Sequence, residues 1–454
     1  MTARTCLFVL PLLLARPVYA ETMSECVDAC REKTAGSPDR AAFKTCALAC
    51  RDSATPDAPA APAPAPAERT VESIDPNFRL RWHATVSQEG AFDEVVNAVA
   101  PLPDGGGLAV GQSFELGPDL ASHYDQLLLA RVDSKGALAW RKAVPAAGDW
   151  EGLGATVLPS GVPVVVGSKD TDGTPDLWAA ALRDDGSFLW EQSWSRTQSD
   201  ALQAVVADGD GLLVVGNLGD SSAAGRHPWI ARLGADGALQ WERELKPEVP
   251  VTCENAVSDG QGGLLLVGYS GNYAMEQRAF VAAVDASGTE RWHKLLGGKD
   301  DRLSGATPAG PGWLVVGTAR SQGAGGGDAW VAQLDAAGNV QWEKTYGGAG
   351  EDSGLTVLPQ ADGAYTLVGT ASSFSEFVIR GVFAMGISPD RGARIWLEAP
   401  SFASDHVALD ARRMANGDLL IGGAEAVFGT APGEGVKDND GYVVQLGLGP
   451  GALK

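Results

Sequence analysis

The chain has 454 residues, of which 57 are acidic and 35 basic, giving a formal net charge of −22 at pH 7. Such an acidic surface repels nucleic acid and anionic lipid, so neither is expected as a partner. Beyond its first residues the sequence has no apolar run long enough to cross a bilayer, and we expect no membrane span in the mature chain.

Residues 1–20 are typical of an export signal. Arg4 precedes the apolar run from Leu7 to Ala15, and Ala20 is a small residue suited to cleavage. The apolar run is too short to span a bilayer as a helix. The sequence therefore predicts an exported bacterial protein located in the periplasm, on the cell surface or in the medium.

Residues 21–52 are predicted to form a small helical hairpin. Cys26 and Cys30, like Cys46 and Cys50, are four residues apart, which places each pair on one face of a helix. A hairpin of this size cannot bury enough apolar surface to fold alone. In an oxidising compartment, antiparallel helices would be joined by the disulfides Cys26–Cys50 and Cys30–Cys46. Ligation of zinc by the four thiolates is the alternative.

A linker rich in proline and alanine is predicted over residues 53–76. Its first part, residues 53–69, has too few apolar side chains to form a core. Such a tract adopts an extended polyproline II conformation and acts as a semi-rigid spacer.

Residues 77–454 carry a tandem repeat. From about Asp93 onward, each unit contains four short segments that are β-branched or alternating and are bounded by Gly, Asp or Pro, as strands are. Four antiparallel strands per unit are typical of a β-propeller blade, which predicts an all-β fold. A tryptophan marks the fourth segment of the units, at Trp82, Trp140, Trp190, Trp241, Trp292, Trp342 and Trp396.

The order of segments at the two ends predicts a closed ring of seven blades. The last unit stops after its third segment, Gly441 to Leu446, whereas Phe78 to Thr85 carries a tryptophan, as a fourth segment does. The N-terminal strand would then complete the last blade. Closure buries every blade face and removes open edges. A glycine expected in each second strand also occurs seven times, at Gly111, Gly167, Gly216, Gly268, Gly317, Gly369 and Gly422.

The turn between the third and fourth segments has a fixed pattern. In five copies a glycine follows an alanine by six residues and a tryptophan follows it by ten, as in Ala130 to Trp140. This pattern resembles the repeat of quinoprotein-like, PQQ-type bacterial β-propellers. The resemblance implies the scaffold only, in a non-catalytic branch, because the adjacent cysteine pair of the catalytic members is missing. We expect the glycine to take a positive φ and the tryptophan to pack between blades.

An acidic residue recurs where each inner strand begins. Carboxylates around one rim would concentrate negative potential and bind cations or a basic peptide at the mouth of the central channel. The alternative is that each acid accepts hydrogen bonds from backbone N–H groups of its own turn. These rim acids are Asp93, Asp149, Asp200, Glu254, Asp301, Asp352 and Asp405.

A weaker candidate is a calcium loop. Asp170, Asp172 and Asp176 flank a glycine with the close spacing of carboxylates in such loops, although the glutamate that completes an EF-hand is missing. A solvated turn is the alternative. Calcium is thus possible, and no other cofactor is expected.

The sequence has no pattern that indicates a catalytic centre. Its five histidines lie without metal-ligand spacing, and Cys253 is expected to be a buried, inert thiol. We therefore predict a monomeric, non-catalytic scaffold that binds a protein or a polysaccharide through rim loops and the channel mouth. A calcium-assisted propeller hydrolase or lyase and an envelope-assembly scaffold are the alternatives.

Overall fold

The structure is a computed structural model, and the chain divides into two compact units, Met1–Pro62 and Ala63–Lys454. All the described residues belong to the second unit. They are residues 79–447 without 88–92, 117–122, 145–147, 171–172, 198, 220–224, 272–275, 375–379, 399–404 and 429–435. The predicted export signal, helical hairpin, disulfides and linker lie outside the described residues.

The described residues form an all-β structure of strands β1 to β28, and no membrane-spanning helix occurs among them. Five sheets have four antiparallel strands each, joined in chain order. They are β6 (Trp150–Val157), β7 (Pro163–Asp170), β8 (Pro175–Leu182) and β9 (Phe188–Trp194); β10 (Asp200–Asp208), β11 (Gly211–Leu218), β12 (His227–Leu233) and β13 (Leu239–Glu244); β14 (Val251–Ser258), β15 (Leu264–Ser270), β16 (Arg278–Val284) and β17 (Glu290–Leu296); β18 (Arg302–Ala309), β19 (Gly312–Ala319), β20 (Asp328–Leu334) and β21 (Val340–Tyr346); and β22 (Asp352–Pro359), β23 (Tyr365–Ala371), β24 (Gly381–Ile387) and β25 (Arg394–Glu398).

The remaining sheet has eight strands and contains both ends of the described chain. β28 and β2 are joined by one parallel pair, Asp93 opposite Asn439. The path runs β26-β27-β28-β2-β3-β4-β5, and β1 pairs with β28. Its strands are β1 (Arg79–Thr85), β2 (Asp93–Pro101), β3 (Gly107–Leu116), β4 (His123–Val132), β5 (Leu138–Val144), β26 (His406–Arg413), β27 (Leu419–Phe428) and β28 (Val436–Gly447).

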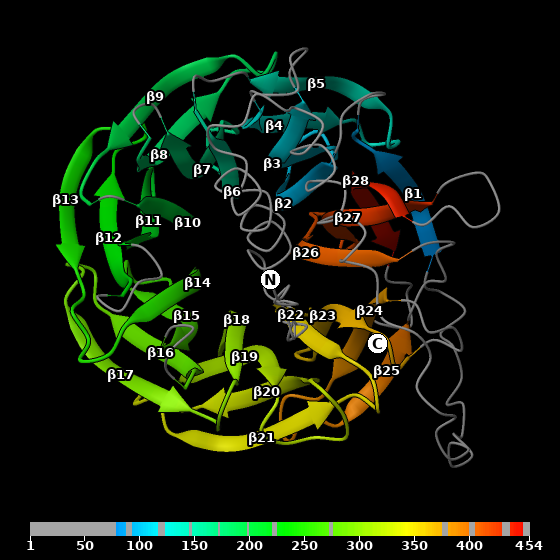
Figure 1. Cartoon of the computed structure of the whole chain (residues 1–454). Coiled ribbons are helices and arrows are strands. Elements are labelled where there is room, and N and C mark those ends of the chain that lie inside the picture. The colour runs from blue at the N-terminus through cyan, green and yellow to red at the C-terminus, as the bar shows by residue number, and fades with distance from the viewer. Residues whose placement is uncertain are drawn as a thin grey trace, which may run out of the picture. The chain divides into compact units, whose positions relative to one another are not determined.

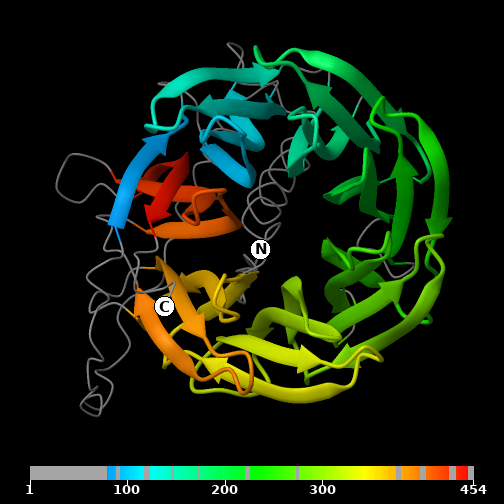
Figure 2. The same ribbon diagram turned by 180° about the vertical axis from the view of Figure 1, so that it is seen from behind.

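Within this unit the sheets stand around a common centre, in the manner of a β-propeller (Figure 1). The first strand of each set of four lies on the inside and the fourth on the outside, and the view from behind shows the same order (Figure 2). The apolar core lies between neighbouring sheets. One cluster, for example, combines Val166 of β7 with Leu202 of β10 and Val214 of β11, all fully buried. Each such side chain contributes about 2 kcal/mol by leaving water.

The predicted pairing of the first strand with the last is confirmed. β1 runs antiparallel to β28, with Trp82 opposite Gln445 and Thr85 opposite Tyr442. Just beyond β1, the Val86 backbone N–H donates to the carbonyl of Gly441 over 2.8 Å. The two ends of the described chain are therefore held together by a backbone ladder.

The second-strand glycines face a bulge in each inner strand. The register between β2 and β3 shifts between Val96 and Ala98, and a Cβ on Gly111 would lie 1.8 Å from the carbonyl oxygen of Val95. Only glycine allows this close approach. In the last set of strands the residue with this contact is Gly423, so the prediction of Gly422 is wrong by one position.

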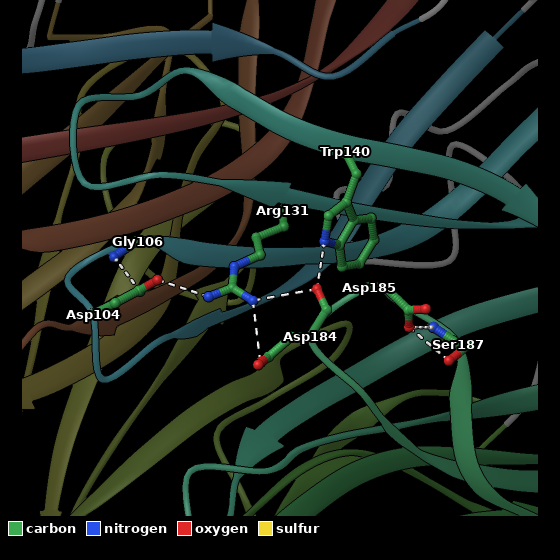
Figure 3. A network of polar contacts seen from close by, with 7 residues as sticks. All are labelled: Asp104, Gly106, Arg131, Trp140, Asp184, Asp185 and Ser187. Carbon is green, nitrogen blue, oxygen red and sulfur yellow. Dashed lines mark hydrogen bonds and ion pairs between the residues drawn. The ribbon is translucent and has the colours of Figure 1, made fainter.

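The repeat tryptophans connect each sheet to the next. The Trp140 indole N–H of β5 donates to the Asp184 carbonyl over 2.8 Å, in the turn between β8 and β9 (Figure 3). Gly186 in that turn has a φ of +74°, and its Cβ, if present, would lie 2.7 Å from the Trp140 ring. The positive φ of this glycine is as predicted. The tryptophan packs on the turn of the following sheet and stays half-buried.

The same tryptophan contact recurs around the unit. A Cβ on each turn glycine would lie within 3 Å of the indole of the preceding set of strands. We call these contacts the Trp–Gly contacts; they join Trp82 to Gly136, Trp140 to Gly186, Trp190 to Gly237, Trp241 to Gly288, Trp292 to Gly338 and Trp342 to Gly392. The side chain of Trp396 lies outside the described residues.

Candidate functional site

Three of the seven rim acids are fully buried and hold backbone turns. Asp200, Asp301 and Asp352 are each at most 1% exposed. The carboxylate of Asp352 accepts the backbone N–H groups of Gly348, Ser372 and Ser373 at 2.9–3.1 Å. These residues belong to two different connections, one before β22 and one after β23. The carboxylate therefore ties the two connections together, which is the capping alternative.

Asp301 makes a similar set of contacts. Its carboxylate accepts the backbone N–H groups of Gly298, Arg320 and Ser321 at 2.6–2.9 Å, and the Ser321 hydroxyl donates to it over 2.6 Å. Hydrogen bonds to an ionised carboxylate are stronger than those between neutral groups. The connection before β18 and the connection after β19 are consequently both held by this one side chain.

Replacing Asp301 by asparagine is expected to lower the free energy of unfolding by about 2 kcal/mol, because a charge-assisted acceptor of N–H groups is lost in a buried site. The measurement is urea unfolding followed by tryptophan fluorescence. Asp133→Asn is the control, because Asp133 accepts the N–H groups of Lys135 and Ala137 in an exposed turn. Equal losses in the two variants would contradict the role assigned to burial.

The other four rim acids differ in their surroundings. Asp93 accepts both the backbone and the side-chain N–H of Asn439, at 3.0 and 2.8 Å. Asp149 is exposed and accepts the backbone N–H of Asp125 over 3.2 Å. Asp405 is partly exposed and lies 3.8 Å from the Arg380 guanidinium. Glu254 is buried on β14. The strand register places Asp93, Asp149 and Asp405 one residue before the repeat position of the three buried acids, and Glu254 three residues after it. The seven carboxylates therefore share neither one repeat position nor one degree of solvent exposure.

The predicted calcium loop lies between β7 and β8. Asp170 accepts the backbone N–H of Gly173 over 2.6 Å, as an acid in an ordinary turn does. Asp176 is partly buried on β8. Asp172 lies outside the described residues, so the set of three carboxylates is a prediction that the structure leaves open.

Cys253 is fully buried on β14, where burial and the neighbouring charge of Glu254 raise the pKa of its thiol to about 12. Only the thiolate attacks electrophiles, so native protein should leave this residue unmodified by iodoacetamide at pH 8. Peptide mass spectrometry after alkylation, with and without urea, measures this. Alkylation at equal rates in both conditions would show that the thiol is accessible in the native state.

A cluster that sequence reasoning missed lies where the two chain ends meet. It consists of His83 on β1, His406 on β26 and Glu425 on β27, with one ligand atom from each within 4.8 Å of the others. His406 Nε2 lies 2.9 Å from Glu425 Oε2, and His83 Nε2 lies 3.6 Å from the same oxygen. We call these three residues the closure cluster. Two imidazoles and a carboxylate can bind a metal ion or exchange protons.

The surroundings hold the three side chains in place. Tyr442 of β28 is fully buried, and its ring stacks on His83 at 5.5 Å and meets His406 edge-on at 5.0 Å. The Thr85 hydroxyl donates to Glu425 Oε1 over 3.0 Å. The closure cluster is therefore backed by an aromatic ring on one side and oriented by a hydroxyl group.

The acid–base properties of the cluster follow from its burial. Burial lowers the pKa of His83 below its ordinary value, and the nearby Glu425 carboxylate opposes this effect. Burial alone would raise the pKa of Glu425, but the hydrogen bond from His406 and the charges of both histidines lower it overall.

The sequence held only a faint signal for this cluster. His83 follows the repeat tryptophan Trp82, and His293 follows Trp292 in the same way. His293 stacks on Phe280 at 6.0 Å and lies 2.6 Å from Glu290, so in these two copies the imidazole packs on an aromatic ring of the third strand. The other two members of the closure cluster, His406 and Glu425, come from the opposite end of the described chain, which spacing along the sequence could not reveal.

Comparison with known proteins gives no family. No protein family and no curated protein matches the chain. Solved structures match it at low identity, including puromycin hydrolase (S511A mutant), at 15% identity and a TM-score of 0.48, over 82% of this chain and 55% of the other. A protein of unknown function from Dyadobacter fermentans matches at 12% identity and 0.47, over 82% and 100%. The Pan2 WD40 domain of Neurospora crassa matches at 10% identity and 0.40, over 65% and 88%.

Proposed function

We propose that the chain is an exported, non-catalytic scaffold with a seven-bladed propeller that binds a protein or a polysaccharide. Counting the eight-stranded sheet as two blades supports the number seven. β28 and β2 meet through the single pair of Asp93 and Asn439, whereas neighbouring strands within a blade share a continuous ladder. The tryptophan-bearing repeat supports placing the chain beside quinoprotein-like propellers of the non-catalytic kind.

The binding surface in this proposal is the face that carries the rim acids. It consists of the connections that precede each inner strand and those between second and third strands. Buried carboxylates such as Asp301 and Asp352 hold both kinds of connection in place. The connection from Ala371 of β23 to Gly381 of β24 is the longest between consecutive strands in the described chain. Long connections on a rigid scaffold are common sites of recognition.

The observation that carries the proposal is that rim acids of two kinds share this face. The buried ones fix the backbone, while Asp149 and Asp405 lie one residue earlier in their sets of strands, accept one backbone N–H each and keep solvent exposure. Fixed loops lose little conformational entropy on binding, and exposed carboxylates attract a cationic partner such as a basic protein segment. We place the partner in the cell envelope, in keeping with the predicted signal over residues 1–20.

The test uses a double variant, Asp149→Asn with Asp405→Asn, as bait in a quantitative pull-down from an envelope fraction. Loss of about one charge-assisted contact per acid predicts at least a tenfold lower recovery of a partner that the parent retains. The matched control is Asp285→Asn with Asp335→Asn, because these acids lie in exposed turns between third and fourth strands. Equal recovery by all three proteins would refute binding through the rim-acid face.

Export is tested separately by cell fractionation and N-terminal sequencing. Cleavage after Ala20 predicts a mature chain that begins at Glu21 in the exported fraction. Retention of the uncleaved chain in the cytoplasm would refute this part of the proposal and leave the question of the binding face unaffected.

A further inference from the structure

The geometry points to a divalent transition-metal site formed by His83, His406 and Glu425, with zinc as the ion that its ligands favour. The site is independent of the partner-binding face proposed above. Its ligands come from three strands, β1, β26 and β27, and thus from both ends of the described chain. A bound ion would join the first described strand directly to the last set of strands.

The distances suit a zinc ion. With bonds of about 2.0–2.1 Å, a tetrahedral zinc ion holds its ligand atoms roughly 3.3 Å apart. The distances from Glu425 Oε2 to His406 Nε2 and His83 Nε2, 2.9 and 3.6 Å, lie on either side of this value. The three ligand atoms all lie within 4.8 Å of one another, so movements of the side chains alone would bring them to this spacing.

The ligand types decide which ion is favoured. Two imidazole nitrogens and one carboxylate suit zinc and similar transition metals, whereas calcium prefers six or more oxygen ligands. Three protein ligands leave a fourth position for water. The side chain of His83 is 25% exposed and that of His406 only 3%, so an ion would enter from the His83 side.

Thr85 and Tyr442 already hold the three ligand side chains in place. The Thr85 hydroxyl donates to Glu425 Oε1, which leaves Oε2 directed at both histidines. The Tyr442 ring covers the two imidazoles and limits the rotation of their side chains. Outer-shell groups of this kind orient ligands and raise the affinity for metal.

The test is a titration of the purified full chain with Zn²⁺ by isothermal calorimetry. The parent should bind about one equivalent more than Glu425→Gln or His83→Gln, as a single three-ligand site requires. The affinity of this equivalent should fall by more than about 100-fold in either variant, since losing an outer-shell partner alone costs about 10–100-fold. The readout is the difference between proteins, because cysteines near the N-terminus could bind zinc in all of them.

His293→Gln is the matched control, because His293 has the same repeat position, an aromatic neighbour and a carboxylate partner but is not part of the closure cluster. It should bind as much zinc as the parent. Thermal unfolding gives a second readout, in which Zn²⁺ raises the midpoint of the parent and of His293→Gln but not that of Glu425→Gln. Identical zinc binding and midpoint shifts in all four proteins would overturn the assignment.

Discussion

Gly338→Ala is expected to lower the free energy of unfolding by about 3 kcal/mol. Gly338 has a φ of +77°, a conformation that costs a residue with a Cβ about 1–2 kcal/mol. Its added Cβ would also lie 2.5 Å from the Trp292 ring, and relieving such overpacking costs about 1–3 kcal/mol. Both effects act on one Trp–Gly contact, which joins β17 to the turn before β21.

Urea unfolding of Gly338→Ala and Gly363→Ala separates the two effects. Gly363 has a φ of +86°, but a Cβ there would meet nothing within 4 Å. In Gly363→Ala the free energy of unfolding should therefore fall only by the cost of the positive φ, about 1–2 kcal/mol. If the free energy of unfolding falls equally in both variants, the clash with the Trp292 indole contributes nothing to the loss in Gly338→Ala.

The double variant Trp292→Ala with Gly338→Ala tests the contact directly. Removing the indole makes room for the new Cβ, so the loss in the double variant should be smaller than the sum of the two single losses, by about 1 kcal/mol or more. Strict additivity would mean that Trp292 and Gly338 do not interact in the folded chain.

The regular spacing of tryptophan and glycine predicts the strands and the repeats, and the order of the segments at the two ends predicts that these ends pair. It could not show which tryptophan meets which glycine. Within one repeat Gly338 is close in sequence to Trp342, yet its partner is Trp292 of the preceding set of strands. Contacts between sets of strands depend on how the sheets are placed around the centre, and a periodic sequence fits several such placements.

The rim acids illustrate another limit of sequence reasoning. The register of the strands places Asp149 one residue before the repeat position of Asp301, a position that Trp150 occupies in its own set of strands. Asp149 is exposed, whereas Asp301 is buried under backbone N–H groups. A repeat pattern read from the sequence does not resolve an offset of one residue, and only Asp301 accepts the backbone N–H groups of Arg320 and Ser321 in the connection after β19. Substitution of Asp301 therefore perturbs folding, so the exposed acids are the better probes of binding.

The closure cluster could not be predicted for a topological reason. Its ligands lie on strands from opposite ends of the described chain and become neighbours only when β1 pairs with β28. Sequence reasoning did predict that pairing, but not the side chains that it brings together. Any site formed at a closure of this kind has the same property, because its residues share no local motif.

Removing β1 is expected to have the largest effect on the fold. A chain that begins at residue 87 should lose its cooperative unfolding transition, whereas a chain that begins at residue 79 should keep it. Without β1, the edge of β28 loses its ladder, and the fully buried side chains of Tyr442 and Val443 lose their neighbours on that side. Trp82 and its contact with Gly136 are lost as well.

The loss of unfolding free energy should exceed about 5 kcal/mol, the lower end of the stability of a typical domain, because the outer edge of β28 would be open and its buried side chains uncovered. Circular dichroism during urea unfolding measures the cooperativity of the transition, and light scattering measures association of the chains.

Adding a synthetic peptide of residues 79–87 tests the cause, since a strand supplied in trans can pair with the free edge of β28. Recovery of the transition with this peptide, but not with one that carries Trp82→Ala and Ala84→Asp, would locate the effect in β1. A cooperative transition in the chain that begins at residue 87, without peptide, would mean that the other strands close the structure by themselves.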